Sequence, residues 1–237
     1  MNTFVLVHGA WHGKWCWEKV TALLESSGNR AIAIDLPGHG EDTTPLKEVT
    51  MESYVQRVTQ VINEIGHEII LVGHSLGGGI ITQVAENIPS NISRLIYLAG
   101  VIPQSGQTLL DVVLLDENSL IIQNQIPSED NLGANIRQEA ITEIFYGDCA
   151  AEDASRAISM LTTQPLAPVT AALNYSEKNF GSIPKVYLKT LQDKAIIPRL
   201  QDLMIEHHSF ENVLELDTGH CPFISNPGLL AEHLMTF

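Results

Sequence analysis

Cysteine is scarce in this 237-residue chain, and its placement excludes two classes of small protein. The three cysteines, Cys16, Cys149 and Cys221, are widely spaced, odd in number and without a C-x-x-C pair. A disulfide framework or a zinc site needs paired or closely spaced cysteines. The sequence therefore predicts neither, and we expect no metal and no cofactor.

Long apolar runs and a secretory leader are also missing. No stretch approaches the roughly 20 apolar residues that span a bilayer. The first residues, Met1-Asn2-Thr3-Phe4, lack the basic segment, long apolar run and small-residue cleavage site of a signal peptide. From these absences we expect a soluble, cytoplasmic protein that does not associate with membranes.

Positive charge is in short supply. The chain has 13 Lys and Arg against 28 Asp and Glu, a net charge of −15, which disfavours nucleic acid and acidic lipid surfaces as partners. Between Pro103 and Pro184 there are 11 acidic and 3 basic residues, a balance of −8. We interpret this local excess as a solvated outer face.

What is present is an alternation of short apolar runs with longer amphipathic stretches, the pattern of a parallel sheet covered by helices. We predict an α/β class with a mostly parallel central sheet of about six strands, at 4–7, 31–34, 69–72, 95–98, 186–188 and 213–216. Helices are predicted at 18–26, 51–65, from 77 to before Pro89, 198–207 and 227–235.

The segment 103–183 breaks this alternation and is too long for a loop. Its pattern indicates several short helices, among them 135–145 and 151–161. We therefore predict a core formed by 1–102 and 184–237, with a helical cap, 103–183, inserted before the last two strands.

A nucleophile elbow is predicted at Gly73-His74-Ser75-Leu76-Gly77, which has the form G-x-S-x-G. It lies between a predicted buried strand and a predicted helix, which is the context that this motif requires. Ser75 is therefore the candidate nucleophile. We interpret its neighbour His74 as a packing residue.

A serine hydroxyl needs a base within hydrogen-bond reach. In proteins that carry a nucleophile elbow between a strand and a helix, the order along the chain is nucleophile, acid, histidine. Only His220 combines that order with a place after the last strand, at the carboxyl edge of the sheet. Two acids remain candidates. Asp193 follows a strand, whereas Asp217 is three residues before His220, a spacing that favours a local turn contact, so Asp193 is preferred.

The oxyanion hole should use two backbone N–H groups, from Leu76 after the nucleophile and from Ala10 after the first strand. Apolar cap segments are expected to cover Ser75 and to line an apolar pocket. The candidate substrate-binding residues are Gly9, Trp11, Leu114, Phe145 and Leu166.

Several segments together resemble one family. The opening 8–17, HGAWHGKWCW, is similar to the start of plant methylesterases, hydroxynitrile lyases and related bacterial esterases, including pyrethroid hydrolases. The segments 72–78, 193–198 and 162–168 also match, and 145–148 is more similar to the bacterial branch. The resemblance covers nearly the whole chain and implies an α/β-hydrolase with Ser75, Asp193 and His220 in the triad.

The resemblance implies hydrolysis of small hydrophobic carboxylic esters through an acyl-enzyme. Two departures disfavour the lyases, which have threonine where this chain has Gly9 and lysine where it has Cys221. Two alternatives stay open: a carbon–carbon lyase that cleaves cyanohydrins, and a binding protein that retains the triad. The expected partner is a small-molecule ester, and the oligomeric state is open, with a homodimer as one alternative.

Overall fold

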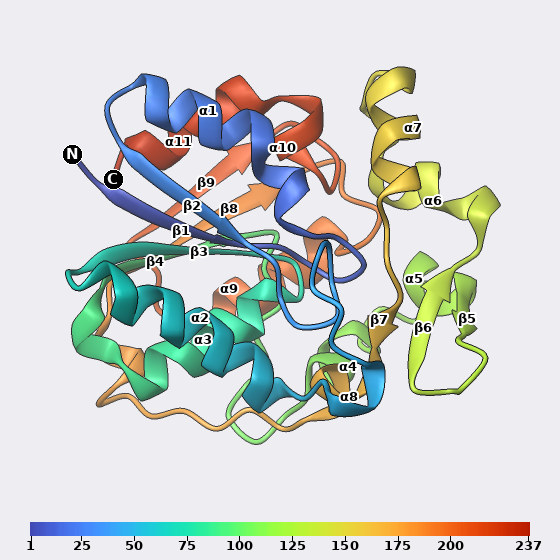
Figure 1. Cartoon of the computed structure of the whole chain (residues 1–237), viewed down its shortest axis with the longest axis horizontal. Helices are drawn as coiled ribbons and strands as arrows, with labels where there is room; N and C mark the ends of the chain where they lie inside the picture. The colour runs from blue at the N-terminus through green and yellow to red at the C-terminus, as the bar shows by residue number, and fades with distance from the viewer.

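A six-stranded sheet runs through the middle of the molecule, in a computed structural model that describes residues 1–237 (Figure 1). The strand order is β2-β1-β3-β4-β8-β9 and every neighbouring pair is parallel. This confirms the predicted, mostly parallel sheet of about six strands. Its members are β1 (Thr3–Val7), β2 (Arg30–Ile34), β3 (Ile69–His74), β4 (Ile92–Leu98), β8 (Lys185–Thr190) and β9 (Asn212–Leu216).

Helices cover both faces of this sheet (Figure 1), as its buried central strands require. One face is covered by α1 (Glu18–Ser26), α10 (Pro222–Ser225) and α11 (Pro227–Met235), and the other by α2 (Met51–Ile65), α3 (Gly77–Asn87) and α9 (Pro198–His207). The start of α2 has a capping box, in which Thr50 and Ser53 satisfy each other's backbone N–H groups. Gly66, with φ of 75°, ends that helix. Short 3-10 turns lie at Lys14–Trp17, Leu46–Glu48 and Pro89–Asn91.

The segment between β4 and β8 is not purely helical, which corrects the predicted helical cap. It contains a separate antiparallel sheet of three strands, β5 (Gln125–Pro127), β6 (Gly133–Ile136) and β7 (Gln164–Pro165). Strands of two to four residues are too short for an alternating pattern to be recognised in sequence. The helices here are α4 (Leu109–Val113), α5 (Leu120–Asn124), α6 (Gln138–Phe145), α7 (Ala151–Ser159), α8 (Leu166–Thr170) and the 3-10 turn Phe180–Ser182.

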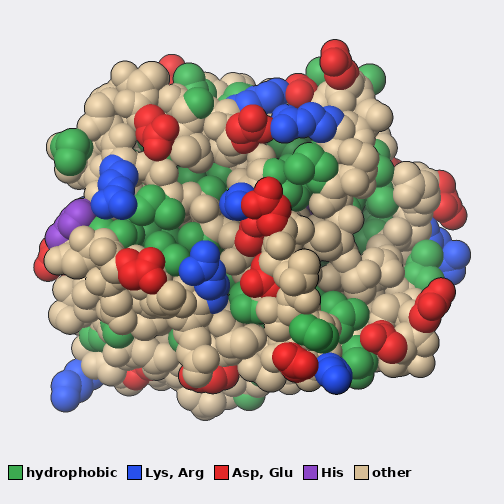
Figure 2. All heavy atoms as spheres, viewed as in Figure 1, with side chains coloured by type: hydrophobic (Ala, Val, Ile, Leu, Met, Phe, Trp, Pro, Cys, Tyr) green, Lys and Arg blue, Asp and Glu red, His purple; other side chains and the backbone are tan.

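Charged side chains are scattered over the face seen in Figure 2 and do not gather in one patch, although several acidic ones lie along its right edge. No helix is long and apolar enough to cross a membrane.

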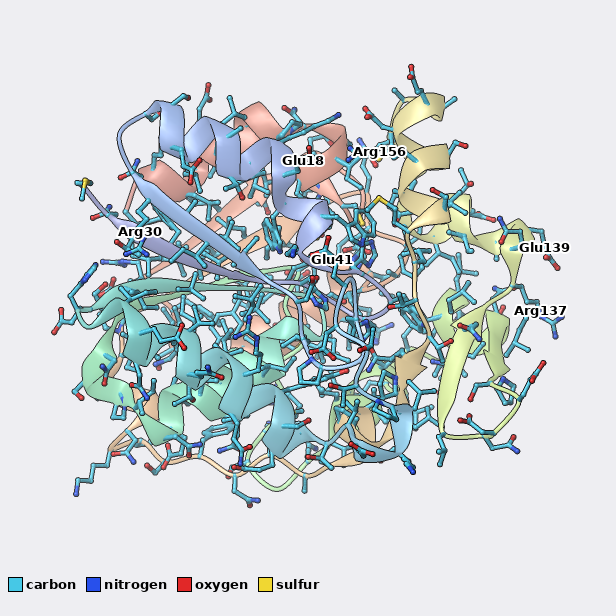
Figure 3. The ribbon with its side chains drawn as sticks, viewed as in Figure 1. Glu18, Arg30, Glu41, Arg137, Glu139 and Arg156 are labelled. Atoms are coloured by element: carbon cyan, nitrogen blue, oxygen red, sulfur yellow. The ribbon has the colours of Figure 1, made fainter.

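Ion pairs join the inserted segment to the core at the surface. Figure 3 shows Glu18 of α1 facing Arg156 of α7, and their side chains are 2.6 Å apart. Lys19 and Asp153 form a second pair at 2.8 Å. Because such exposed pairs contribute at most about 1 kcal/mol each, they orient the segment more than they stabilise it.

Buried polar contacts hold the segment more firmly over the carboxyl ends of the strands. The Tyr146 hydroxyl donates to His12 Nε2 at 2.8 Å, and the Thr162 N–H donates to the Trp11 carbonyl at 2.9 Å. The segment therefore lies over the loops that follow β1.

Candidate active site

Ser75 stands on a strained turn between β3, which ends at His74, and α3, which begins at Gly77. Its φ of 52° is in the left-handed region, which non-glycine residues seldom occupy. A Cβ on Gly73 would lie 2.6 Å from the Gly77 carbonyl oxygen, so only glycine allows strand and helix to pass this closely. The Ser75 carbonyl accepts from the N–H groups of Gly78 and Val101, at 2.9 and 2.8 Å, which holds the turn.

His220 and Asp193 form a buried pair at the same edge of the sheet. His220 follows β9, and its Nδ1 lies 2.8 Å from Asp193 Oδ2. Because a carboxylate oxygen only accepts, Nδ1 carries the proton and Nε2 is left with its lone pair. Both side chains are almost completely buried. The arrangement leaves the imidazole able to take up a proton at Nε2.

Four hydrogen bonds fix the Asp193 carboxylate. Oδ1 accepts from the N–H groups of Ala195 and Ile196, each at 2.8 Å, and Oδ2 accepts from the Thr190 hydroxyl at 2.8 Å as well as from His220. Behind this loop the buried Gln201 side chain bonds to the backbone of Thr190 and to the Ile196 carbonyl. Gln201 was not predicted from sequence, although a glutamine on the apolar face of α9 could have indicated it.

The other candidate acid, Asp217, lies away from the imidazole. Its side chain is exposed and accepts a hydrogen bond from Gln192 Nε2 at 2.8 Å. The structure therefore places Asp193, and not Asp217, against His220.

His74 has a larger role than packing, which corrects the interpretation from sequence. Its Nε2 lies 2.9 Å from the His220 carbonyl oxygen, so Nε2–H is the donor, and the two rings are 4.5 Å apart. Burial keeps the pKa of His74 well below its usual value, so the ring is neutral. This contact joins the elbow to the His220 loop. The Ser75 hydroxyl itself makes no hydrogen bond to the imidazole here.

Two backbone N–H groups next to Ser75, those of Ala10 and Leu76, have no acceptor within the protein, and both residues line the same pocket as Ser75. The Gly9–Ala10 peptide is held from its other side, because His8 Nδ1 lies 2.8 Å from the Gly9 carbonyl and donates to it. The Leu36 N–H donates to His8 Nε2 at 3.2 Å, which fixes that tautomer. Sequence reasoning did not identify His8.

The pocket above Ser75 is mainly apolar and encloses about 100 Å³. Ala10, Trp11, Ser75, Leu76, Val101 and Ile196 form its core side. The inserted segment closes it with Leu109, Leu110, Val113, Ile121, Ile122 and Leu166, among others.

Of the five predicted substrate-binding residues, the structure places Trp11 and Leu166 in this wall and the other three outside it. Leu114 follows the last residue of α4 and is 52% exposed. Gly9 lies beneath the elbow, where an added Cβ would be 2.9 Å from the Ser75 Cβ. Phe145 packs between the rings of Trp11 and His220, with centroids 5.6 and 5.7 Å away.

His220 lines a second, polar cavity of about 230 Å³ together with Phe145. Charged and amide side chains form much of its wall, including Glu143, Asp148, Gln192 and Lys194. Asp148 also accepts from the Gly219 N–H at 2.7 Å, which ties the inserted segment to the His220 loop. No three His, Cys, Asp or Glu side chains are grouped as metal ligands.

Comparison with known sequences gives a consistent group of relatives. A chloroplastic protein of Arabidopsis thaliana, provisionally named methylesterase 11, is 35% identical over 99% of this chain, which spans only 63% of that protein's length. Methylesterase 2 of the same plant is 30% identical, with 98% of this chain and 94% of that protein covered.

Solved structures agree. A pyrethroid hydrolase of Sphingobium faniae superposes with a TM-score of 0.90 at 30% identity, covering 100% of this chain and 96% of that one. A methylesterase of Arabidopsis superposes with a TM-score of 0.88 at 28% identity, covering 100% and 98%. The family model described as the alpha/beta hydrolase family matches residues 4–233. The chain therefore belongs to the alpha/beta hydrolase family, in the group that includes plant methylesterases and bacterial pyrethroid hydrolases.

Proposed function

We propose that this protein hydrolyses small hydrophobic carboxylic esters, with Ser75 as nucleophile, His220 as base and Asp193 as the acid that orients it. The observation that carries the proposal is the position of Ser75 in an apolar pocket, beside two backbone N–H groups without acceptors. An ester carbonyl placed there would have a nucleophile on one side and two donors for its developing negative charge.

In the first step His220 Nε2 takes the proton of the Ser75 hydroxyl as the oxygen attacks the ester carbonyl carbon. The N–H groups of Ala10 and Leu76 stabilise the resulting oxyanion. When the intermediate collapses, the carbon–oxygen bond to the alcohol breaks and the alcohol leaves with the proton from His220. Asp193 keeps Nδ1 protonated throughout, so Nε2 can act first as base and then as acid.

In the second step water hydrolyses the acyl-serine ester, with His220 again removing and returning one proton. Acid and free Ser75 are then regenerated.

The pocket supports an uncharged substrate with a short apolar group. Its wall carries no Lys, Arg, Asp or Glu side chain, and about 100 Å³ is room for a few carbon atoms only. Because the three plant relatives described above are named methylesterases, one of them provisionally, we propose a small alcohol such as methanol as the leaving group.

The lyase alternative is weaker because the position that carries lysine in those enzymes is a fully buried cysteine. Burial raises the pKa of Cys221 well above its usual value, so the thiol is neutral and offers no positive charge to a departing cyanide. An assay for cyanide release from an aromatic cyanohydrin tests this alternative.

The cytoplasmic location and the homodimer stay predictions.

A panel of short-chain p-nitrophenyl esters, compared with the Ser75→Ala variant, tests the proposal. We expect turnover of acetate and butyrate esters by the parent protein and a loss of about 10³-fold or more in Ser75→Ala. Equal rates in the two proteins would refute the enzyme and leave the binding-protein alternative.

A further inference from the structure

The loop that carries the Ala10 N–H contains a strained residue. Trp11, which follows Ala10, has a φ of 63°, in the left-handed region that residues other than glycine seldom adopt. A bulky residue in this region is unfavourable and persists only where the surrounding contacts hold it. The contacts of this loop therefore show which groups keep Ala10 in place.

Three hydrogen bonds hold Trp11 and the peptide before it. The Thr162 N–H donates to the Trp11 carbonyl at 2.9 Å, and the indole N–H donates to the Ala134 carbonyl at 2.8 Å. The third bond is made to the Ala10 carbonyl, which lies 2.8 Å from His12 Nδ1. No other group of the protein donates to the Ala10 carbonyl, so its direction depends on His12.

The His12 ring has the tautomer that this contact needs. Because a carbonyl oxygen only accepts, Nδ1 carries the proton. On the other side of the ring the buried Tyr146 hydroxyl donates to Nε2 at 2.8 Å. Burial lowers the pKa of His12 to about 3, so the ring is neutral and Nδ1–H is its one N–H group.

Aromatic neighbours hold the His12 ring in this orientation. The side chain is 1% exposed and stacks on Trp15, with the ring centroids 5.4 Å apart and the planes inclined by 25°. Phe145 and Phe223 pack against it edge to face, at 5.9 and 6.0 Å. The Nδ1–H group therefore cannot turn away from Ala10 without disturbing this packing.

Two peptides meet at the Ala10 Cα, and a histidine holds each of them. His8 donates to the carbonyl of the Gly9–Ala10 peptide, and His12 donates to the carbonyl of the Ala10–Trp11 peptide. Because the two peptides share one Cα, a shift of either displaces the Ala10 N–H. A misplacement of about 1 Å in a catalytic group can lower the rate about 10²-fold.

We infer that His12 is a positioning residue, whose Nδ1–H holds the Ala10 carbonyl and thereby keeps the Ala10 N–H where the oxyanion forms. The inference rests on the proposed function and adds a residue to its oxyanion hole. His12 is not part of the pocket wall, so its loss should lower kcat and leave KM nearly unchanged. We expect a fall of about 10- to 100-fold, a part of the loss that follows removal of a whole oxyanion donor.

The test compares His12→Leu with His12→Asn in the hydrolysis of p-nitrophenyl butyrate. Both side chains branch at Cγ as the ring does, and both lose the stacking on Trp15 and the Tyr146 contact. Only asparagine keeps an N–H donor near the position of Nδ1. We expect similar losses of melting temperature in the two variants, but a kcat about 10- to 100-fold lower in His12→Leu than in His12→Asn. Equal values of kcat would leave a packing role alone and overturn the inference.

A ketone that forms a stable oxyanion separates this inference from the proposed function. With 1,1,1-trifluoro-2-pentanone, Ser75 Oγ bonds to the carbonyl carbon, the serine proton passes to His220, and the carbonyl oxygen becomes an oxyanion without a leaving group. Its dissociation constant, measured by fluorine NMR, should be about 10- to 100-fold higher in His12→Leu than in His12→Asn.

The two measurements fail in different ways. If the parent hydrolyses no ester, the proposed function fails, yet ketone binding that depends on the donor at position 12 would still support the positioning role. Equal ketone affinities in the two variants would overturn that role even if every ester were hydrolysed.

A milder variant, Tyr146→Phe, keeps the histidine and removes only the hydroxyl that donates to its Nε2. The ring can then move its proton to Nε2, toward Cys221 Sγ at 3.7 Å, which leaves the Ala10 carbonyl without a donor. We expect the dissociation constant of the ketone to rise about 3- to 10-fold, the order of one hydrogen bond. Tyr97→Phe is the matched control, because it removes a buried hydroxyl that bonds to Thr82 outside the pocket. Equal affinities in these two variants would also overturn the inference.

Discussion

Replacing Asp193 with asparagine should abolish most of the esterase activity while leaving the fold intact. The two backbone N–H groups of Ala195 and Ile196 both point at Oδ1, so the asparagine must place its carbonyl oxygen there. Its NH2 group then faces His220 Nδ1. Two donors cannot face each other, so the imidazole moves its proton to Nε2 and can no longer accept the proton of Ser75.

The magnitude follows from that change of tautomer. Loss of the correct tautomer in a triad of this kind reduces kcat by about 10⁴-fold, which corresponds to roughly 5.4 kcal/mol of transition-state stabilisation. KM should change little, because Asp193 is buried behind the ring and outside the apolar pocket. The effect should therefore be almost entirely on kcat.

The assay is the hydrolysis of p-nitrophenyl butyrate over a range of concentrations. Asp217→Asn is the matched control: the same change of side chain, made three residues before His220 at an exposed site. We expect it to change kcat by less than about twofold, as exposed substitutions usually do. A loss of less than tenfold in Asp193→Asn, or an equal loss in Asp217→Asn, would refute the assignment.

Three further predictions concern the residues around Ser75. His8→Leu removes the donor that holds the Gly9–Ala10 peptide, so kcat should fall about 10²- to 10³-fold if the Ala10 N–H is displaced, whereas His39→Leu, another buried neutral histidine, should affect stability alone. Gly9→Thr puts a Cβ 2.9 Å from that of Ser75, and this overpacking should cost about 1–3 kcal/mol in an unfolding experiment. Burial lowers the pKa of His8 to about 4 and of His12 to about 3. Below pH 6.5 the unfolded chain therefore binds more protons than the folded protein does. As the pH drops toward 4, each of these two histidines should lower the free energy of unfolding, measured in urea, by up to about 1.4 kcal/mol per pH unit.

Each of these has a clear contrary outcome. Equal losses of kcat in His8→Leu and His39→Leu would show that the oxyanion peptide does not depend on His8. An unchanged unfolding free energy in Gly9→Thr would mean that the elbow has more room than the contact distance allows. Stability that stays constant between pH 7 and pH 5 would contradict the burial of the neutral histidines.

Much of this fold was predictable because its signals are local. The continuous apolar runs of β1 and β3 indicate central strands of a parallel sheet, and the bounds predicted for α1, α2, α9 and α11 agree with the structure. The elbow at Ser75 was predictable too, since a glycine on either side of a serine between strand and helix permits its close turn. In the inserted segment the strands are too short for such patterns, and β5, β6 and β7 were missed.

Taken alone, the sequence determined the order of the central strands and of the helices that cover them, the turn that carries Ser75 and the two candidate acids, because near neighbours along the chain decide these features. Tertiary structure alone decided that Asp193 meets His220 and that His74 holds the His220 carbonyl. Each of these depends on groups that lie far apart in the sequence or on how one side chain is turned. No periodicity encodes them, since a hydrogen bond is set by distance and angle in space.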